Sequence, residues 1–184
     1  MTDVAVLVGS LRKESLNHKM ALAVATLSPP SLKMKSVEIG NLPLYNEDLE
    51  ADAPAQWRSF RDRVRASDAV LFVTPEYNRG VPGGLKNAID VGSRPYGQSI
   101  WDNKPTAIIS VSPGSIGGFG ANHALRQSFV FLNMPAMQQP EAYIGGAATL
   151  FDGDGRLKNE STRKFLEAFI KAFESWVAAH PTAR

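Results

Sequence analysis

The chain contains no cysteine, which excludes a disulfide framework, an iron–sulfur centre and a thiol nucleophile. It also lacks a strong charge imbalance: 20 Lys and Arg stand against 18 Asp and Glu, so it carries no electrostatic footprint for nucleic acid. No apolar run approaches the ~18–20 residues that a membrane-spanning helix needs. Residues 1–30 have no basic segment followed by an apolar secretory segment. We therefore expect a cytoplasmic protein with no nucleic-acid partner and no membrane partner.

Apolar strand-like runs and amphipathic segments alternate along the chain. The predicted strands and helices are, in turn, 4–9, 33–39, 69–74, 105–111 and 135–139, and 15–27, 54–67, 83–92, 120–132 and 159–179. Five such units predict an α/β fold, in which an open parallel sheet is covered by helices on both faces. Ligands of these sheets bind beyond the carboxyl ends of the strands, where the strand order reverses. The loops after the first, third and fourth strands are therefore the candidate site.

The first of these loops joins a buried strand to a helix. The apolar run Val4–Val8 is too short for a helix and ends at Gly9, and apolar residues recur at helical spacing from Leu16 onward. The loop and the first helical turn carry groups that bind phosphate, namely Ser10, Arg12, Ser15 and Asn17. A helix N-terminus adds free N–H groups and a partial positive charge. Since the patterns G-x-G-x-x-G and G-x-x-x-x-G-K-[ST] are missing, we expect a phosphate carrier other than a dinucleotide or ATP.

The second and third loops are rich in proline and glycine. The second, Thr74–Asn87, contains Pro75, Tyr77 and Asn78, which suit a planar heterocycle, although a simple turn explains them equally well. The third, Ser110–Gly120, has four glycines within seven residues and allows close backbone approach to a ligand. A helix follows it at once, so we expect free N–H groups at its start to face the same crevice.

No metal site is expected. The histidines His18, His123 and His180 have no metal-like spacing. The segment Asp152–Gly155 resembles the start of a calcium loop, but the position that needs Glu holds Arg163. A turn is the better interpretation of that segment.

Taken together, the three loops resemble one family. The motifs G-S-L-R-K-x-S-x-N, P-E-Y-N and S-x-G-x-x-G-G, with 42–49 (LPLYNEDL) and 81–90 (VPGGLKNAID), are similar to those of NADPH-dependent FMN reductases. Within that family the chain looks most like the bacterial chromate/quinone reductases. The resemblance implies a flavodoxin-like three-layer sandwich with strand order 2-1-3-4-5, formed by residues 1–184 as a single FMN-binding domain.

The resemblance also implies which residues bind FMN. The phosphate would lie on Ser10, Arg12, Ser15, Leu16 and Asn17. The isoalloxazine would lie between Pro75, Glu76, Tyr77 and Asn78 on one side and Ser112, Gly114, Gly117 and Gly118 on the other. Arg79, together with Tyr77, is a candidate contact of the nicotinamide or the substrate. The implied assembly is a homodimer or homotetramer with FMN near a subunit interface.

The implied activity needs no catalytic side chain, because FMN N5 carries the hydride. NADH or NADPH would donate two electrons to FMN, and a small-molecule acceptor, a quinone or a chromate, nitro or azo compound, would then take them. One alternative is a flavodoxin-like electron carrier, but such carriers are typically strongly acidic and this chain has a formal charge of +2. Another alternative is a flavin reductase that supplies free reduced FMN.

Overall fold

The computed structural model describes residues 1–182 and contains one five-stranded parallel sheet. Its strands are β1 (Thr2–Val8), β2 (Leu32–Ser36), β3 (Ala69–Thr74), β4 (Thr106–Val111) and β5 (Ala142–Ile144). Its helices are α1 (Leu16–Leu27), α2 (Ala55–Arg65), α3 (Gly83–Gly92), α4 (Phe119–Phe131) and α5 (Glu160–Ala179), with two short 3₁₀ turns, η1 (Glu47–Leu49) and η2 (Ala147–Thr149). The strand order is β2-β1-β3-β4-β5, so the predicted flavodoxin-like order is confirmed.

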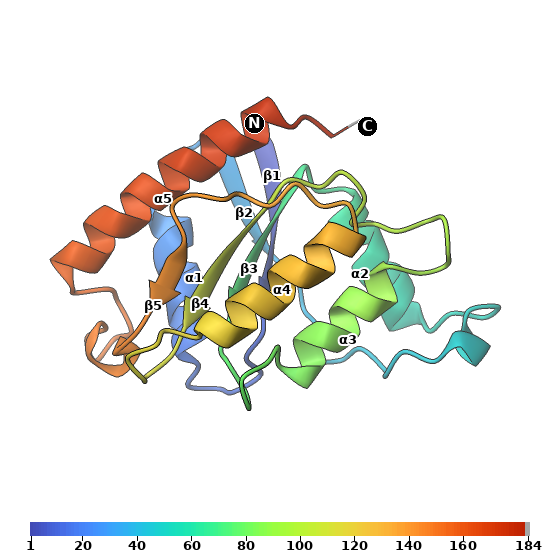
Figure 1. Cartoon of the computed structure of the whole chain (residues 1–184), viewed down its shortest axis with the longest axis horizontal. Helices are drawn as coiled ribbons and strands as arrows, with labels where there is room; N and C mark the ends of the chain where they lie inside the picture. Colours follow the sequence, from blue (N-terminus) through green and yellow to red (C-terminus); the bar gives the residue numbers. More distant parts are fainter. Residues whose placement is uncertain (183–184) are drawn as a thin grey trace.

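The alternation of side chains along the strands separates two apolar cores. In β1, Val4, Val6 and Val8 face the core that α1 and α5 cover, whereas Ala5 and Leu7 face the core that α2, α3 and α4 cover. Figure 1 shows the resulting three layers. Because both faces are covered, every residue of β3 and β4 is buried, as parallel strands require.

The register of the strands sets the position of the loops. Val8 lies beside Val73 in the neighbouring strand, and Thr74 lies beside Ser110 in the next. The carboxyl ends of β1, β3 and β4 are thus aligned at one edge of the sheet (Figure 1). The chain crosses from β1 to β2 on one side and returns to β3 on the other, so this edge is where the strand order reverses.

The predicted strand at 135–139 is wrong. Ala136 makes only an isolated bridge to Thr106, and the fifth strand, β5, follows at Ala142–Ile144 beside Ile109–Val111. The segment carries apolar side chains at Met134 and Met137, which are buried and produced the strand-like pattern. Pro140 has no N–H group to donate, so the ladder cannot run through it. The edge strand therefore forms only beyond the proline.

The remaining boundaries agree with the predictions within a few residues. The second strand is shorter than the predicted 33–39, although the Val37 N–H still donates to the Val6 carbonyl at 3.0 Å. Helix α2 ends at Arg65 instead of 67. Among the described residues 1–182, no helix is both long enough and apolar enough to cross a bilayer.

Candidate functional site

The first loop lies directly against the second, and Gly9 is where they meet. Its N–H donates to the Val73 carbonyl at 2.9 Å. A β-carbon on Gly9 would lie 2.9 Å from Thr74 Oγ1 and 3.2 Å from Pro75 Cδ. Such distances are too short for any side chain, so glycine is needed for this close approach.

The predicted phosphate-binding groups gather at the start of α1. Ser15 is the N-cap residue, and its Oγ accepts a hydrogen bond from the His18 N–H at 3.2 Å. Ser10, Ser15 and Asn17 are buried, Leu16 is partly buried and Arg12 is exposed. Ser15 keeps its hydroxyl proton for a further bond, and Arg12 keeps its side chain in solvent at the rim. Ser15, Leu16 and Asn17 thus form the start of α1, and Ser10 and Arg12 belong to the loop that leads into it.

Asn17 carries the clearest sign of a ligand site. Its Oδ1 atom is buried and has no hydrogen-bond partner among the described residues. A buried polar atom without a partner costs about 1–3 kcal/mol, so natural proteins rarely keep one without a reason. A ligand that brings a hydrogen-bond donor to this helix end would satisfy the Asn17 amide oxygen.

The second loop is held by a tight turn at its tip. The N–H of Tyr77 donates to the Gly80 carbonyl at 3.1 Å, and the Gly80 N–H donates back to the Tyr77 carbonyl at 2.9 Å. The two central residues, Asn78 and Arg79, have φ angles of +50° and +64°, which define a turn of the I′ kind. Pro75 is buried, whereas the Tyr77 side chain is 47% exposed. The loop therefore has a fixed backbone and an open aromatic ring.

The third loop bends through two glycines in the left-handed region. Gly117 and Gly118 have φ angles of +66° and +78°, and Gly118 is the N-cap of α4. Ser112 Oγ accepts a hydrogen bond from the Gly114 N–H at 3.1 Å, which shapes the start of the loop. A β-carbon on Gly118 would lie 3.8 Å from Glu76 Cβ, so the second and third loops are in contact.

The prediction of free N–H groups at the start of α4 needs a correction. The Ala121 N–H donates to Glu76 Oε2 at 3.1 Å, so a carboxylate of the protein already occupies this helix end. The other carboxylate oxygen, Oε1, accepts from Arg79 Nη1 at 3.2 Å. The sequence alone did not reveal this contact, because the two partners are 45 positions apart.

One residue of the first loop escaped the sequence prediction. Leu11 is 57% exposed, yet it lies against Gly40, in the segment after β2, and Gly84, in the first turn of α3. A β-carbon on Gly40 would be 3.1 Å from Leu11 Cδ2, and one on Gly84 would be 3.4 Å from Leu11 Cδ1. The available signal was an apolar residue inside an otherwise polar loop.

An aromatic group flanks the third loop. Phe119 and His123 on α4 contact Tyr143 on β5, with ring centroids 4.1 Å apart for Phe119 and His123 and 5.3 Å apart for Phe119 and Tyr143. His123 Nε2 and the Tyr143 hydroxyl are 2.9 Å apart. Burial, assisted by the neighbouring Glu141, raises the pKa of Tyr143 to about 12. The phenol therefore stays protonated at neutral pH.

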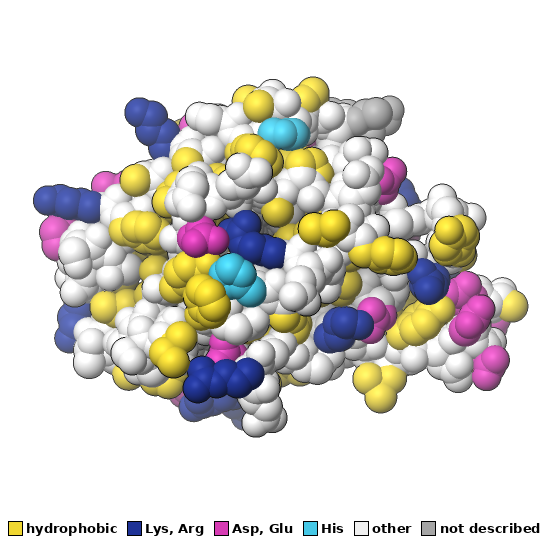
Figure 2. Space-filling view, viewed as in Figure 1, with side chains coloured by type: hydrophobic (Ala, Val, Ile, Leu, Met, Phe, Trp, Pro, Cys, Tyr) yellow, Lys and Arg dark blue, Asp and Glu magenta, His cyan; other side chains and the backbone are white. Residues whose placement is uncertain are grey.

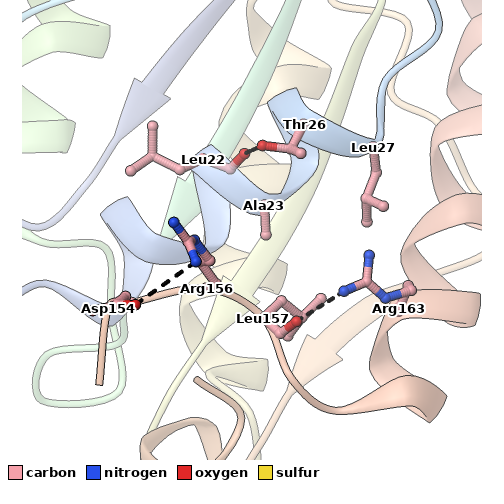
Figure 3. Close-up of a pocket in the computed structure, with 9 residues that line it drawn as sticks. Leu22, Ala23, Thr26, Leu27, Asp154, Arg156, Leu157 and Arg163 are labelled. Atoms are coloured by element: carbon pink, nitrogen blue, oxygen red, sulfur yellow. Dashed lines mark hydrogen bonds and ion pairs between the residues drawn. The ribbon is translucent and has the colours of Figure 1, made fainter. Parts of the chain in front are cut away.

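A separate cavity of about 320 Å³ lies between α1, the segment after η2 and the start of α5 (Figure 3). Leu22, Leu27 and Leu157 supply apolar walls, and Arg156 and Arg163 reach toward it. Both arginines have protein partners: Arg156 pairs with Asp154 at 3.7 Å, and Arg163 Nη2 donates to the Leu157 carbonyl at 2.9 Å. It shares no residue with the predicted set, so it is distinct from the site at the strand ends. Among residues 1–182, no group of three or more His, Asp or Glu side chains is arranged to hold a metal.

The fold and the three loops define a flavodoxin-like protein whose polar loops converge at one sheet edge. A family model described as NADPH-dependent FMN reductase matches residues 2–149. The chain belongs to this family. It is therefore an oxidoreductase, and the predicted cofactors, FMN with a nicotinamide electron donor, are confirmed at the level of the family.

Similar proteins cover nearly the whole chain. A quinone reductase from Pseudomonas putida is 70% identical over 176 residues, with 95% of this chain and 94% of that protein covered. A 2-hydroxy-1,4-benzoquinone reductase from a Burkholderia species is 45% identical over 174 residues, with 95% of each covered. The solved structure of FerB, a flavoenzyme NAD(P)H:(acceptor) oxidoreductase from Paracoccus denitrificans, matches with a TM-score of 0.94 at 46% identity, over 99% of this chain and all of FerB.

The residues of this site fit FMN. The phosphate of FMN needs hydrogen-bond donors and a cation, which the start of α1 and Arg12 supply. The unpaired buried amide oxygen of Asn17 fits a ligand rich in hydroxyl donors, such as the ribityl chain. In the third loop, a β-carbon on Gly114 would meet Ser112 Oγ at an ordinary contact distance of 3.5 Å, so a ligand can approach the backbone at this glycine.

Proposed function

We propose that this protein transfers two electrons from NADH or NADPH, through FMN, to quinones. The observation that carries the proposal is the convergence of three polar loops at the sheet edge where the strand order reverses, together with the unpaired amide oxygen of Asn17 in the first turn of α1. The two relatives described as quinone reductases support the choice of acceptor. When bound, FMN supplies the hydride-accepting atom N5, so the chain itself needs no catalytic side chain.

The chain's contribution is to bind and orient. In this proposal the phosphate lies at the start of α1, on Ser10, Arg12, Ser15, Leu16 and Asn17. The α1 dipole and the Arg12 guanidinium both favour a dianion there. Burial of Ser10, Ser15 and Asn17 keeps water from competing for these bonds.

The isoalloxazine lies between the second and third loops in this proposal. Pro75, Glu76, Tyr77 and Asn78 line one side, and Ser112, Gly114, Gly117 and Gly118 line the other. The I′ turn fixes the backbone beside the ring, and the half-exposed Tyr77 leaves one face open to small molecules. In this proposal Arg79, whose side chain is 74% exposed at the tip of the turn, contacts the anionic nicotinamide cofactor.

An open ring face sets the range of acceptors. Quinones are flat and suit stacking on an exposed flavin, and chromate, nitro and azo compounds are further acceptors that the same exposed ring would reduce. The nicotinamide must leave before the acceptor enters, because both use one face. The proposal therefore predicts competition between the oxidised nicotinamide product and the quinone.

The proposal also includes a homodimer or homotetramer in the cytoplasm, with residues 1–184 acting as one FMN-binding domain. Tyr96, Val130 and Phe131 are each at least four-fifths exposed, and Figure 2 shows hydrophobic side chains spread over the face that carries α4. Phe131 lines two adjacent surface grooves, one shared with Tyr96 and the other with Ile89 of α3. Large exposed apolar side chains beside grooves of this kind favour contact with a second copy.

Anaerobic titration of the FMN-loaded protein with NADPH, followed by its visible spectrum, tests the proposal. We expect direct bleaching to the hydroquinone and recovery of the colour on addition of a quinone. Slow bleaching with a stable semiquinone on chemical reduction would instead indicate a one-electron carrier. Release of FMN on reduction would indicate a supplier of free reduced flavin. A protein that retains no FMN would overturn the assignment of the site.

A further inference from the structure

Glu76, in the second loop, accepts a hydrogen bond from the start of α4, which follows the third loop. No sequence motif assigns this hydrogen bond. The side chain of Glu76 is 11% exposed, and its carboxylate accepts two hydrogen bonds, from the Ala121 N–H at 3.1 Å and from Arg79 Nη1 at 3.2 Å. Ala121 is the third residue of α4, so its N–H is one of the donors that a helix start leaves without an internal partner. A residue of the second loop therefore caps the helix that follows the third loop.

Gly120 leaves the space in which the Glu76 carboxylate meets α4. A β-carbon on Gly120 would lie 2.8 Å from Glu76 Oε2 and 3.0 Å from the Arg79 carbonyl oxygen. Gly120 has no positive φ, so backbone conformation does not require glycine at this position. Glycine is needed at position 120 because a side chain there would displace the Glu76 carboxylate.

We propose that Glu76 is a positioning residue, whose carboxylate fixes the spacing between the two loops that bracket the isoalloxazine. This inference rests on the proposed function, because the loops matter as a pair only if a ring lies between them. The side chain acts through α4 and does not need to touch the flavin. Its negative charge suits the positive end of α4, which makes this bond stronger than a neutral cap. Arg79 adds less, because its side chain is 74% exposed and solvent screens its charge.

Four variants distinguish the loss of the contact between Glu76 and α4 from a general loss of stability. Glu76→Ala removes the acceptor, and Glu76→Gln keeps an acceptor for the Ala121 N–H without the charge. Asn159→Ala is the matched control, because Asn159 Oδ1 caps α5 by accepting from the Thr162 N–H at 2.9 Å. Gly120→Ala is a second route to the same disruption, since its methyl group displaces the carboxylate.

The first measurement is the FMN dissociation constant, from the quenching of flavin fluorescence. We expect it to rise about tenfold in Glu76→Ala and in Gly120→Ala, as the loss of a charge-assisted bond implies. Glu76→Gln should recover most of the affinity, and Asn159→Ala should leave it unchanged. Equal weakening in Glu76→Ala and Asn159→Ala, or no weakening in Glu76→Ala, would overturn the inference.

The second measurement needs no flavin: backbone amide hydrogen exchange of the apoprotein. In Glu76→Ala we expect faster exchange at Ala121 and also at Tyr77 and Gly80, whose N–H groups close the turn of the second loop. Unchanged exchange at Tyr77 and Gly80 would show that the carboxylate caps α4 without holding the second loop. That result would reject the proposed positioning role of Glu76. If the wild-type protein binds no FMN, the proposed function fails, and this exchange pattern still decides the role of Glu76.

Discussion

Gly117 and Tyr143 approach so closely that a β-carbon on Gly117 would lie 2.6 Å from the Tyr143 carbonyl carbon. Gly117 also has a φ of +66°, so both its space and its backbone conformation exclude a side chain. This contact holds the third loop against β5. It connects the packing of the sheet edge to the position of the loop.

Gly117→Ala is therefore expected to lower the free energy of unfolding by about 2–4 kcal/mol, from left-handed strain and steric overlap together. Gly146→Ala is the matched control, because Gly146 has a φ of +60° but no atom within 4 Å of the place that a β-carbon would take. The control should lose only the conformational part, about 1–2 kcal/mol. Urea unfolding of both variants gives the difference, and equal losses would rule out the overlap with Tyr143.

Arg12→Ala is expected to weaken FMN binding by roughly 1.5–3 kcal/mol, since it removes a charge-assisted contact with the phosphate. Arg12 is exposed, so the free energy of unfolding of the apoprotein should stay the same. Arg63→Ala, an exposed arginine on α2, controls for the loss of one positive charge. Fluorescence titration with FMN measures both variants, and an unchanged dissociation constant in Arg12→Ala would reject its role.

Most elements could be predicted because they depend on local pattern, whereas the strand order was implied by the family resemblance. Val4 to Val8 and Ala69 to Thr74 are short buried runs, and such runs followed by helical periodicity indicate a parallel sheet. The strand at 135–139 failed because buried Met134 and Met137 imitate a strand, while Pro140 moves the pairing to Ala142–Ile144.

The candidate site was predictable as three loops but not as contacts between them. Its residues could be placed at the strand ends because parallel strands end at one edge. The bond from Ala121 to Glu76 and the fit of Gly9 against Pro75 join segments far apart in the chain. Such tertiary contacts leave no periodic signal in the sequence, so glycine content alone hinted at them.

Asn17→Leu is expected to separate stability from binding. The Asn17 Oδ1 atom is buried without a partner, so replacing the amide with an apolar group of similar size should stabilise the apoprotein by about 1 kcal/mol. The same change should weaken FMN binding at least about tenfold, because the ligand loses a hydrogen bond.

Asn122→Leu is the control for Asn17→Leu, because it replaces a buried asparagine whose amide has partners within the protein. The buried Asn122 amide donates to Ser110 Oγ at 3.3 Å and accepts from Arg126 Nε at 3.2 Å, so this asparagine is satisfied. Its replacement should destabilise the apoprotein by about 1–3 kcal/mol, because the partners are left unpaired. Thermal unfolding of both apoproteins gives the comparison, and a destabilised Asn17→Leu would contradict a ligand-directed amide.

Tyr143 is expected to make the folded state sensitive to alkaline pH. Its pKa is raised from 10.0 to about 12, chiefly by burial. The unfolded chain therefore loses the phenol proton near pH 10, whereas the folded protein retains it up to about 12. The stabilisation associated with the protonated phenol is complete below pH 10 and is lost as the pH rises through this window.

Tyr143→Phe removes the phenol and should flatten this part of the pH profile. The variant loses the contact between the hydroxyl and His123 Nε2, so it should be slightly less stable than wild type at pH 8. Between pH 10 and 12 the gap should narrow, because only the wild-type protein has this proton to lose on unfolding. Urea unfolding at a series of pH values, with tyrosinate absorbance as a direct titration, checks both parts. A constant gap across the window would mean that Tyr143 titrates at its ordinary pKa and is not shielded by the third loop and β5.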